Sequence, residues 1–156
     1  MQRRRLRVMV LDTSPTSRKV LEVILRREGH QVVCFGDPLE ALRFLSRHGP
    51  ADLLFLSLDL PGMDGLTVLK YVKGEPGLRE TVPVALLDGD AGILRRILAR
   101  LAGARHVVTK PLVRQQIVAL VSEIRMRLES PALGEQGDAI ASPQTAGTAS
   151  SGEAGE

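Results

Sequence analysis

Short, almost wholly apolar runs alternate along the chain with segments whose apolar residues recur every three or four positions. The apolar runs predict buried strands, and they lie at 6–11, 31–35, 53–58, 82–87 and 106–108. The helical spacing predicts amphipathic helices at 14–29, 37–49, 66–73, 93–101 and 111–128. A chain that alternates strand and helix in this way is typical of an α/β domain with a parallel sheet and helices on both of its faces.

Capping residues mark several of the predicted helix boundaries. Ser14-Pro15 and Asp37-Pro38 each combine a side chain that can cap a helix with a proline suited to the first turn. Asp64, in the loop 60–65, is predicted to cap the third helix. Five large aliphatic residues mark the fourth helix: Ile93, Leu94, Ile97, Leu98 and Leu101.

Composition narrows the class of protein. The chain has 156 residues, of which 44% are hydrophobic and only 3% aromatic, so Leu, Val, Ile and Ala must build the core of one domain. The single cysteine, Cys34, excludes a disulfide framework and is interpreted as a small buried residue of the second strand. The basic start at 3–5 precedes an apolar run too short for a signal peptide or a membrane helix, which predicts a cytoplasmic protein.

Charge divides the chain into two parts. Residues 130–156 are mostly Gly, Ala, Ser, Thr and Pro with four acidic residues and no Lys or Arg, a formal charge of −4. We expect this stretch to be a disordered acidic tail, and residues 1–129 to be the folded domain, with a formal charge of +7. No aromatic residues are interleaved with the basic ones, which disfavours a nucleic-acid binder despite the basic charge.

Motifs at the predicted strand ends give the chain a family resemblance. The most specific are Leu-Pro-Gly-Met-Asp-Gly at 60–65 and Thr-Lys-Pro at 109–111, supported by the segments at 8–12, 14–18 and 27–33. In this order, over about residues 6–125, the chain resembles the receiver domains of bacterial two-component response regulators. The resemblance implies a flavodoxin-like (βα)5 fold, a doubly wound five-stranded parallel sheet with strand order 2-1-3-4-5.

The resemblance also implies a phosphoryl-transfer site at the carboxyl ends of the strands. In the family, two acidic residues after the first strand bind Mg²⁺, and an Asp after the third strand accepts the phosphoryl group. A Thr or Ser after the fourth strand and a Lys after the fifth hold the phosphoryl oxygens. The chemistry is reasonable, because carboxylates suit Mg²⁺, a carboxylate can form an acyl phosphate, and an ammonium suits a phosphate.

The acceptor and metal positions of this sequence depart from that pattern. The acceptor position is Ser57, a hydroxyl that is a poor nucleophile without a general base. Of the acidic pair, Asp12 is present but its neighbour is Thr13, so Mg²⁺ binding is expected to be weak or absent. Asp59 stands where the family contributes a backbone carbonyl to the metal, and its side chain is a candidate surrogate phosphate acceptor.

The remaining site positions are Asp88, Val107 and Lys110. Asp88 replaces the Thr or Ser, and its carboxylate would repel a phosphate; Val107 replaces the aromatic residue three positions before the lysine. Lys110 is retained. We therefore hypothesise that Lys110 pairs permanently with Asp88, Asp12 or both, since an ammonium among strand ends needs an anion. The alternative is a Lys110 that is simply solvated.

The predicted surface carries a basic face. Its members lie on or near the last two helices and are Arg95, Arg96, Arg100, Arg105 and Arg114. Receivers commonly dock partners on the face of the fourth helix, fifth strand and fifth helix, so these arginines indicate an acidic signalling partner. A solvated arginine face without a partner is the alternative, and the sequence leaves open whether the last helices form a homodimer.

Together these features predict a pseudo-receiver, a protein-interaction module that is independent of phosphorylation and is not an enzyme. The alternative is a conventional phosphorelay regulator that is phosphorylated on a displaced aspartate such as Asp59. The sequence after the last helix shows no sign of an output domain, so we expect a signal to leave through the receiver surface or the tail.

Overall fold

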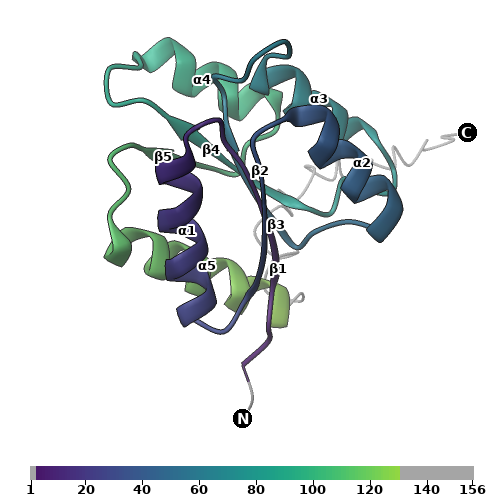
Figure 1. Ribbon diagram of the computed structural model, residues 1–156, viewed down its shortest axis with the longest axis vertical. Coiled ribbons are helices and arrows are strands. Elements are labelled where there is room, and N and C mark those ends of the chain that lie inside the picture. The colour runs from purple at the N-terminus through teal and green to yellow at the C-terminus, as the bar shows by residue number, and fades with distance from the viewer. Residues whose placement is uncertain (1–2, 131–156) are drawn as a thin grey trace, which may run out of the picture.

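The computed structural model describes residues 3–130 and contains a five-stranded parallel sheet in the order β2-β1-β3-β4-β5 (Figure 1). The strands are β1 (Arg7–Leu11), β2 (Gln31–Phe35), β3 (Leu53–Ser57), β4 (Val82–Leu87) and β5 (His106–Thr109). The helices are α1 (Pro15–Arg27), α2 (Pro38–His48), α3 (Gly65–Gly74), α4 (Ile93–Ala102) and α5 (Arg114–Glu129). The predicted fold class and strand order are confirmed.

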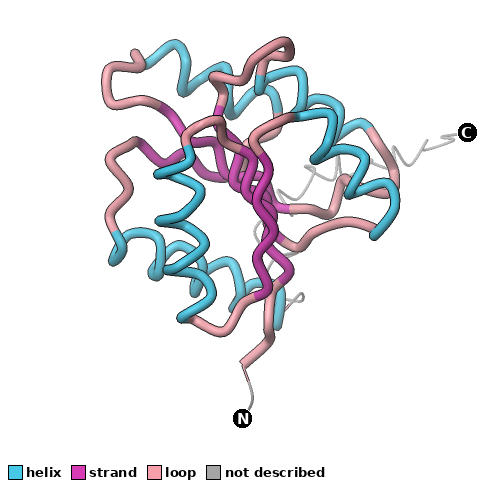
Figure 2. The backbone as a smooth tube through the Cα atoms, viewed as in Figure 1, coloured by secondary structure: helices cyan, strands magenta, loops and turns pink. Residues whose placement is uncertain are grey.

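The sheet is the middle layer between two groups of helices (Figure 2). Alternate residues of the central strands point to opposite faces, so Leu54 and Leu56 of β3 pack towards α2, α3 and α4, whereas Leu53 and Phe55 pack towards α1 and α5. All five residues of β3 are buried, as expected for a strand covered on both faces. The continuous apolar runs of the sequence follow from this double coverage.

The predicted caps are present where helices begin. Ser14 accepts a hydrogen bond from the Ser17 N–H at 3.2 Å, and Asp37 accepts one from the Glu40 N–H at 3.3 Å. Asp64 accepts one from the Leu66 N–H at 3.0 Å, so its predicted capping role is confirmed. These bonds satisfy amide groups that have no partner within their own helix.

Helix α4 is where the apolar pattern and the core disagree. The predicted helix is present, but its large aliphatic residues point to solvent, and the residues that it buries are Ala99 and Ala102. A stripe of Leu and Ile at helical spacing normally faces the core. Here small alanines face the core, and the apolar stripe covers the outer side of the domain.

The structure also bears on the expectations for Cys34, for the tail at 130–156 and for membrane helices. Cys34 lies in β2 as predicted, but it is only half-buried; burial and then the neighbouring Glu22 raise the pKa of its thiol to about 11. The predicted tail lies almost wholly outside the described residues. Within residues 3–130, no helix has both the length and the apolar character needed to cross a membrane.

Candidate functional site

The predicted site residues follow four neighbouring strands of the sheet. Asp12 follows β1, Ser57 ends β3, Asp88 follows β4 and Lys110 follows β5. Parallel strands place these positions at one edge of the sheet, next to the point between β1 and β3 where the order of connection reverses. The fold therefore brings residues as distant in the sequence as Asp12 and Lys110 to one edge of the sheet.

A buried ion pair lies at the centre of this edge. Lys110 Nζ is 2.7 Å from Asp12 Oδ2, and the Asp12 side chain is 1% exposed. At this distance the ammonium and the carboxylate form a close ion pair. The other oxygen, Oδ1, accepts a hydrogen bond from the Ser14 N–H at 2.9 Å.

Backbone contacts on both sides of Lys110 fix the position of its Cα and so the direction of its side chain. The Lys110 N–H donates to the Leu87 carbonyl at 2.8 Å, which continues the β4–β5 ladder by one residue, and the Lys110–Pro111 peptide is cis. A Cβ on Gly89 would lie 3.0 Å from the Lys110 carbonyl oxygen, so the two loops pass close together. Of the two carboxylates predicted to pair with Lys110, Asp12 is in contact with it; no ion pair between Lys110 and Asp88 is present within residues 3–130. That the pair is permanent stays a prediction.

Ser57 is buried beside this pair and makes one local hydrogen bond. Its hydroxyl oxygen accepts from the Asp59 N–H at 3.3 Å, and the residue is 4% exposed. No hydrogen bond joins the hydroxyl to a carboxylate or an imidazole in the part of the chain that the structure describes. The geometry therefore gives Ser57 no general base.

Asp88 and Asp59 form a second group at the rim of the site. Asp88 is exposed, and the adjacent Asp59 carboxyl is the main cause that raises its pKa, with smaller contributions in the same direction from desolvation and the charge of Asp90; the charge of Lys110 opposes the rise. Asp59 also forms an ion pair with Arg95 at 3.0 Å. Two carboxylates and one guanidinium thus share a small, solvent-facing cluster.

The position of Arg95 corrects one detail of the predicted basic face. Its guanidinium donates to the Leu58 carbonyl at 3.3 Å as well as to Asp59, so it points towards the site end of the sheet. Arg96 likewise donates to the Thr109 hydroxyl at 2.6 Å. Arg95 therefore belongs to the rim of the site and is not an open member of a docking face.

The residues present do not fit a bound Mg²⁺ ion. Asp12 is the only carboxylate of the expected acidic pair, and its two oxygens are engaged by Lys110 and the Ser14 N–H. Thr13 is exposed and offers a hydroxyl, and the Asp59 carboxylate is held by Arg95. Within residues 3–130, no three His, Cys, Asp or Glu residues are grouped as metal ligands.

Two contacts of the site were not predicted from the sequence. Arg18 of α1 donates to the Asp12 carbonyl at 2.7 Å, and a Cβ on Gly36 would lie 2.9 Å from Arg18 Nη1. Arg18 belongs to the segment 14–18 that supported the resemblance, but that motif alone does not show what its side chain contacts. The bond from Arg96 to the Thr109 hydroxyl is the second unpredicted contact, and Arg96 remains exposed as expected.

Comparison with known proteins identifies the family that has this arrangement. The family model for the response regulator receiver domain matches residues 8–122, which is most of the described domain. The chain belongs to the response regulator receiver domain family. This receiver has the family fold, and the resemblance seen in the sequence is confirmed at that level.

Two curated relatives show how the receiver is related to known proteins. The DNA-binding response regulator MtrA of Mycolicibacterium smegmatis is 32% identical over 129 residues, which are 82% of this chain and 54% of that protein. Protein PilG of Pseudomonas aeruginosa is 27% identical over 116 residues, 74% of this chain and 84% of that protein. The receiver spans about half the length of MtrA, and its whole activity does not follow from such a relative.

Solved structures agree with the fold. The receiver domain of a signal transduction histidine kinase from Syntrophus aciditrophicus has a TM-score of 0.72 and 26% identity, and the match covers 80% of this chain and 93% of that one. The chemotaxis protein CheY4 of Vibrio cholerae has a TM-score of 0.71 at 19% identity, which supports the fold alone. Membership in two-component signalling is thus established, while the state of the phosphorylation site depends on this chain's own residues.

Proposed function

We propose that this receiver is a pseudo-receiver: a protein-interaction module in two-component signalling that works in the cytoplasm without being phosphorylated and has no phosphotransfer activity of its own. The observation that carries the proposal is the buried pair of Asp12 and Lys110. The lysine that holds the phosphoryl group in the family is here neutralised by the chain's own carboxylate. A phosphoryl group would have to compete with that carboxylate for the same ammonium.

The acceptor position supports the same proposal. Ser57 is buried, accepts its hydrogen bond from a backbone N–H and has no base to remove its proton. The neighbouring Asp88 and Asp59 add negative charge at the rim, which disfavours the approach of a phosphate dianion. The nucleophile, the metal ligands and the phosphate contacts of this site are therefore all unfavourable for phosphorylation.

The second candidate is phosphorylation on Asp59. This residue is half-exposed and lies two positions after Ser57, so a phosphodonor could approach it. Its ion pair with Arg95 would place a guanidinium beside the new phosphoryl group. We rank it second because its carboxylate is already paired and the site lacks a fitting metal.

We also propose that the receiver's partner is a signalling protein of acidic character, and that nucleic acid is disfavoured as a ligand. The support is the set of exposed arginines near β5, which without Arg95 consists of Arg96, Arg100, Arg105 and Arg114. Exposed positive charge raises the association rate of an acidic partner and makes it sensitive to salt.

Exposure to a small phosphodonor with Mg²⁺, followed by intact mass measurement, tests the proposal. We expect no gain of a phosphoryl group by the wild-type chain. A positive control is the triple variant Ser57→Asp, Thr13→Asp and Asp88→Thr, which restores the family residues at three site positions.

The Asp59→Asn variant separates the two candidates. One acid-labile phosphoryl group on the wild-type chain that is absent from Asp59→Asn would establish Asp59 as the acceptor and overturn the pseudo-receiver proposal. A phosphoryl group that remains on Asp59→Asn would overturn both candidates and point to another acceptor.

A further inference from the structure

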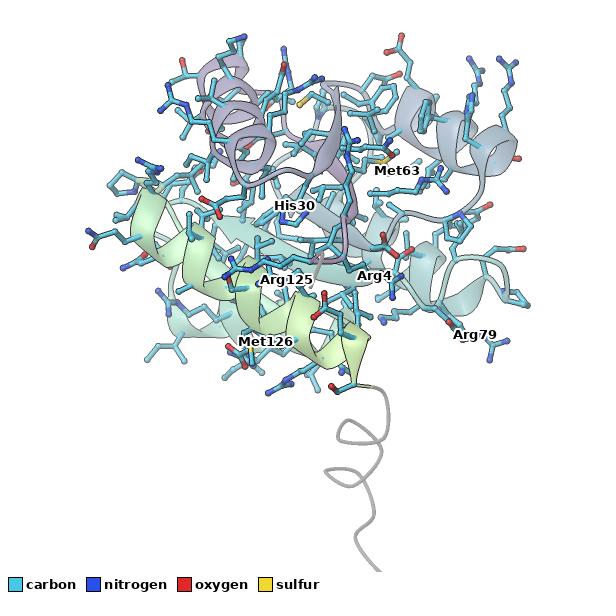
Figure 3. The ribbon with its side chains drawn as sticks, turned by 90° about the horizontal axis from the view of Figure 1, so that it is seen from below. Arg4, His30, Met63, Arg79, Arg125 and Met126 are labelled. Carbon is cyan, nitrogen blue, oxygen red and sulfur yellow. The ribbon has the colours of Figure 1, made fainter. Side chains whose placement is uncertain are left out.

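An open cavity lies at the amino ends of β1 and β2, at the opposite end of these strands from Asp12 and Lys110 (Figure 3). We call it the amino-end cavity, and the residues that line it are Arg5, Arg26, Gly29, His30, Gln31 and Val32. Its volume is about 590 Å³, which is within the range of sites that hold small molecules. Three of its lining residues carry side chains that can donate hydrogen bonds to an anion: Arg5, Arg26 and His30.

Helix α5 adds a buried charge that lacks a close partner. Arg125 is 8% exposed, and its buried Nε has no hydrogen-bond partner among residues 3–130. The carboxylate that pairs with it, Glu129, keeps Oε1 3.9 Å from Nε, and the same oxygen accepts the Arg4 N–H at 2.8 Å. A guanidinium that is removed from water without a close anion is costly, so this position favours a ligand that supplies one.

His30 provides a second donor without an acceptor. Its Nδ1 accepts a hydrogen bond from the Leu6 N–H at 3.0 Å, so the proton of the neutral ring lies on Nε2. Nε2 has no acceptor in the described part of the chain. Burial lowers the pKa of His30, and the charges that act on it next are those of Arg125, Glu28 and Arg5, in that order. These side chains therefore surround the ring, and Figure 3 shows Arg125 beside it.

Arginines at the rim add positive charge. Arg26 is fixed there because its Nη2 donates to the Val32 carbonyl at 3.2 Å, and it also pairs with Glu22 at 3.4 Å. Arg5 is exposed and takes part in no ion pair within residues 3–130. The rim thus has one guanidinium, that of Arg5, which is available to an anion.

Two features oppose an anion in the amino-end cavity. Glu28, at the end of α1, is the carboxylate that acts on His30. The last carbonyls of α1 form the negative end of the helix dipole, but the N–H groups of residues 28–30 occupy three of them. One carboxylate therefore opposes two guanidinium groups, those of Arg5 and Arg125, together with an imidazole N–H.

We propose that the amino-end cavity binds the phosphate group of a small molecule, with the phosphate held by Arg5, Arg125 and the His30 Nε2–H. A phosphate dianion supplies the charge that two guanidinium groups require and accepts several hydrogen bonds at once. Because Arg125 and His30 are almost fully buried, only a small group can reach them, which disfavours nucleic acid or an acidic protein surface. The inference goes beyond the proposed function and does not depend on it.

Isothermal titration calorimetry of the full chain tests the site with three probes: inorganic phosphate, ribose 5-phosphate and acetate. At low ionic strength and a pH of about 7.5, where phosphate is mainly dianionic, we expect both phosphates to bind with dissociation constants below about 1 mM. Acetate should bind at least about tenfold more weakly, because it carries one charge and two oxygens. Tighter binding of ribose 5-phosphate than of phosphate would identify a phosphate ester as the ligand; otherwise free phosphate is the ligand.

The variant Arg125→Met separates a binding role from a structural one. It keeps an apolar side chain in the buried position and removes the charge, so phosphate should bind at least about tenfold more weakly. Its urea midpoint in phosphate-free buffer should equal or exceed that of the wild type, because the uncompensated buried charge is gone. A purely structural arginine would lower that midpoint. The matched control is Arg127→Met on the same helix, where the side chain is 58% exposed and pairs with Glu123; it should change neither quantity.

Two variants at exposed or rim positions supply an arm that does not alter a buried residue. Arg5→Gln should weaken phosphate binding at least about threefold, because it removes the free guanidinium of the rim. Glu28→Gln should strengthen binding about twofold to threefold, because it removes the opposing carboxylate. Circular dichroism checks that each variant is folded, and Arg5→Gln decides the matter if Arg125→Met does not fold.

Three results would overturn the inference. A dissociation constant of the wild type above about 1 mM for both phosphates would exclude the site. Acetate that binds within about tenfold of phosphate would show only a general positive field. A weakening below about threefold in both Arg125→Met and Arg5→Gln, or an equal weakening in Arg127→Met, would place the phosphate elsewhere on the receiver.

Discussion

The Asp12 carboxylate is an anion enclosed by the protein, with two compensating contacts. Lys110 supplies the opposite charge and the Ser14 N–H supplies a hydrogen bond. Removing a buried charge from water is costly, so such a carboxylate is stable only while its partners are present. The pair therefore holds the loops after β1 and β5 together in the unmodified receiver.

Replacing Lys110 by Met should destabilise the receiver by about 3 kcal/mol, because it leaves Asp12 buried without its counter-charge. The double variant Asp12→Asn with Lys110→Met should recover most of that loss, since Asn can still accept from the Ser14 N–H. Urea unfolding monitored by circular dichroism measures both. A loss below about 0.5 kcal/mol in the single variant would show that the pair contributes little to the fold.

A second buried polar residue, His30, lies at the opposite end of the sheet, beside Arg125 of α5 (Figure 3). It is 4% exposed, and its Nδ1 accepts a hydrogen bond from the Leu6 N–H at 3.0 Å, which requires the neutral ring. Burial and then the charge of Arg125 lower its pKa, Glu28 opposes the shift, and Arg5 adds to it. Folding therefore favours the uncharged imidazole.

The receiver should lose stability as pH falls below about 6.5, the ordinary pKa of histidine. Because the folded pKa of His30 is lowered, the unfolded chain binds more protons in this range, and acidification favours unfolding. His106, whose pKa is lowered first by burial, acts in the same direction. Urea midpoints at pH 7.5 and 5.5 should differ less for His30→Asn than for the wild type; an equal difference would contradict the role of His30.

At the scale of elements, the close approach of α3 to the end of β3 sets the shape of the site. A Cβ on Gly65, the first residue of α3, would lie 2.5 Å from Leu58 Cα and 2.6 Å from the Ser57 carbonyl oxygen. Both neighbours are backbone atoms, which cannot rotate away. The glycine thus lets the helix start directly against the acceptor position.

Gly65→Ala should therefore cost about 1–3 kcal/mol and shift the backbone around Ser57. Gly74→Ala at the other end of α3 is the matched control, because a Cβ there meets no atom within 4 Å. The control should be neutral or slightly stabilising, since alanine restricts the unfolded chain more than glycine. Thermal unfolding of the two variants measures the contrast, and equal midpoints would show that the contact at Gly65 relaxes easily.

At the scale of the whole molecule, two cores share one sheet. One lies between the sheet and α2, α3 and α4, and the other between the sheet and α1 and α5. The second core reaches from Leu6 to Ile124, so both ends of the described domain are fixed to it. The Arg4 N–H also donates to the Glu129 carboxylate at 2.8 Å. The stability of the domain therefore comes mainly from contacts among its own strands and helices.

A chain that ends at Ser130 should accordingly unfold within about 0.5 kcal/mol of the full chain, because both cores lie within residues 6–124. Urea unfolding of the two chains side by side measures the difference. A loss greater than about 2 kcal/mol would mean that residues 131–156 contribute to the fold, and would contradict the predicted boundary after residue 129.

The sequence by itself determined the order and type of every element, because a strand buried on both faces and a helix with an apolar stripe leave different periods in the chain. The prediction that Ser57, Thr13 and Asp88 depart from the family pattern also rests on the sequence alone, since motif spacing aligns them without coordinates. The capping role of Asp64 was predictable for a similar reason, because caps act over a few residues.

Only the tertiary structure decided which charges meet and which side of α4 faces outwards. Lys110 had two carboxylates within its predicted reach, and the geometry of the strand ends pairs it with Asp12 and leaves Asp88 beside Asp59. The stripe of α4 has the period of a core helix, yet close packing of the domain admits only Ala99 and Ala102 there. A period shows that a helix has an apolar side; the packing of its neighbours decides whether that side is covered.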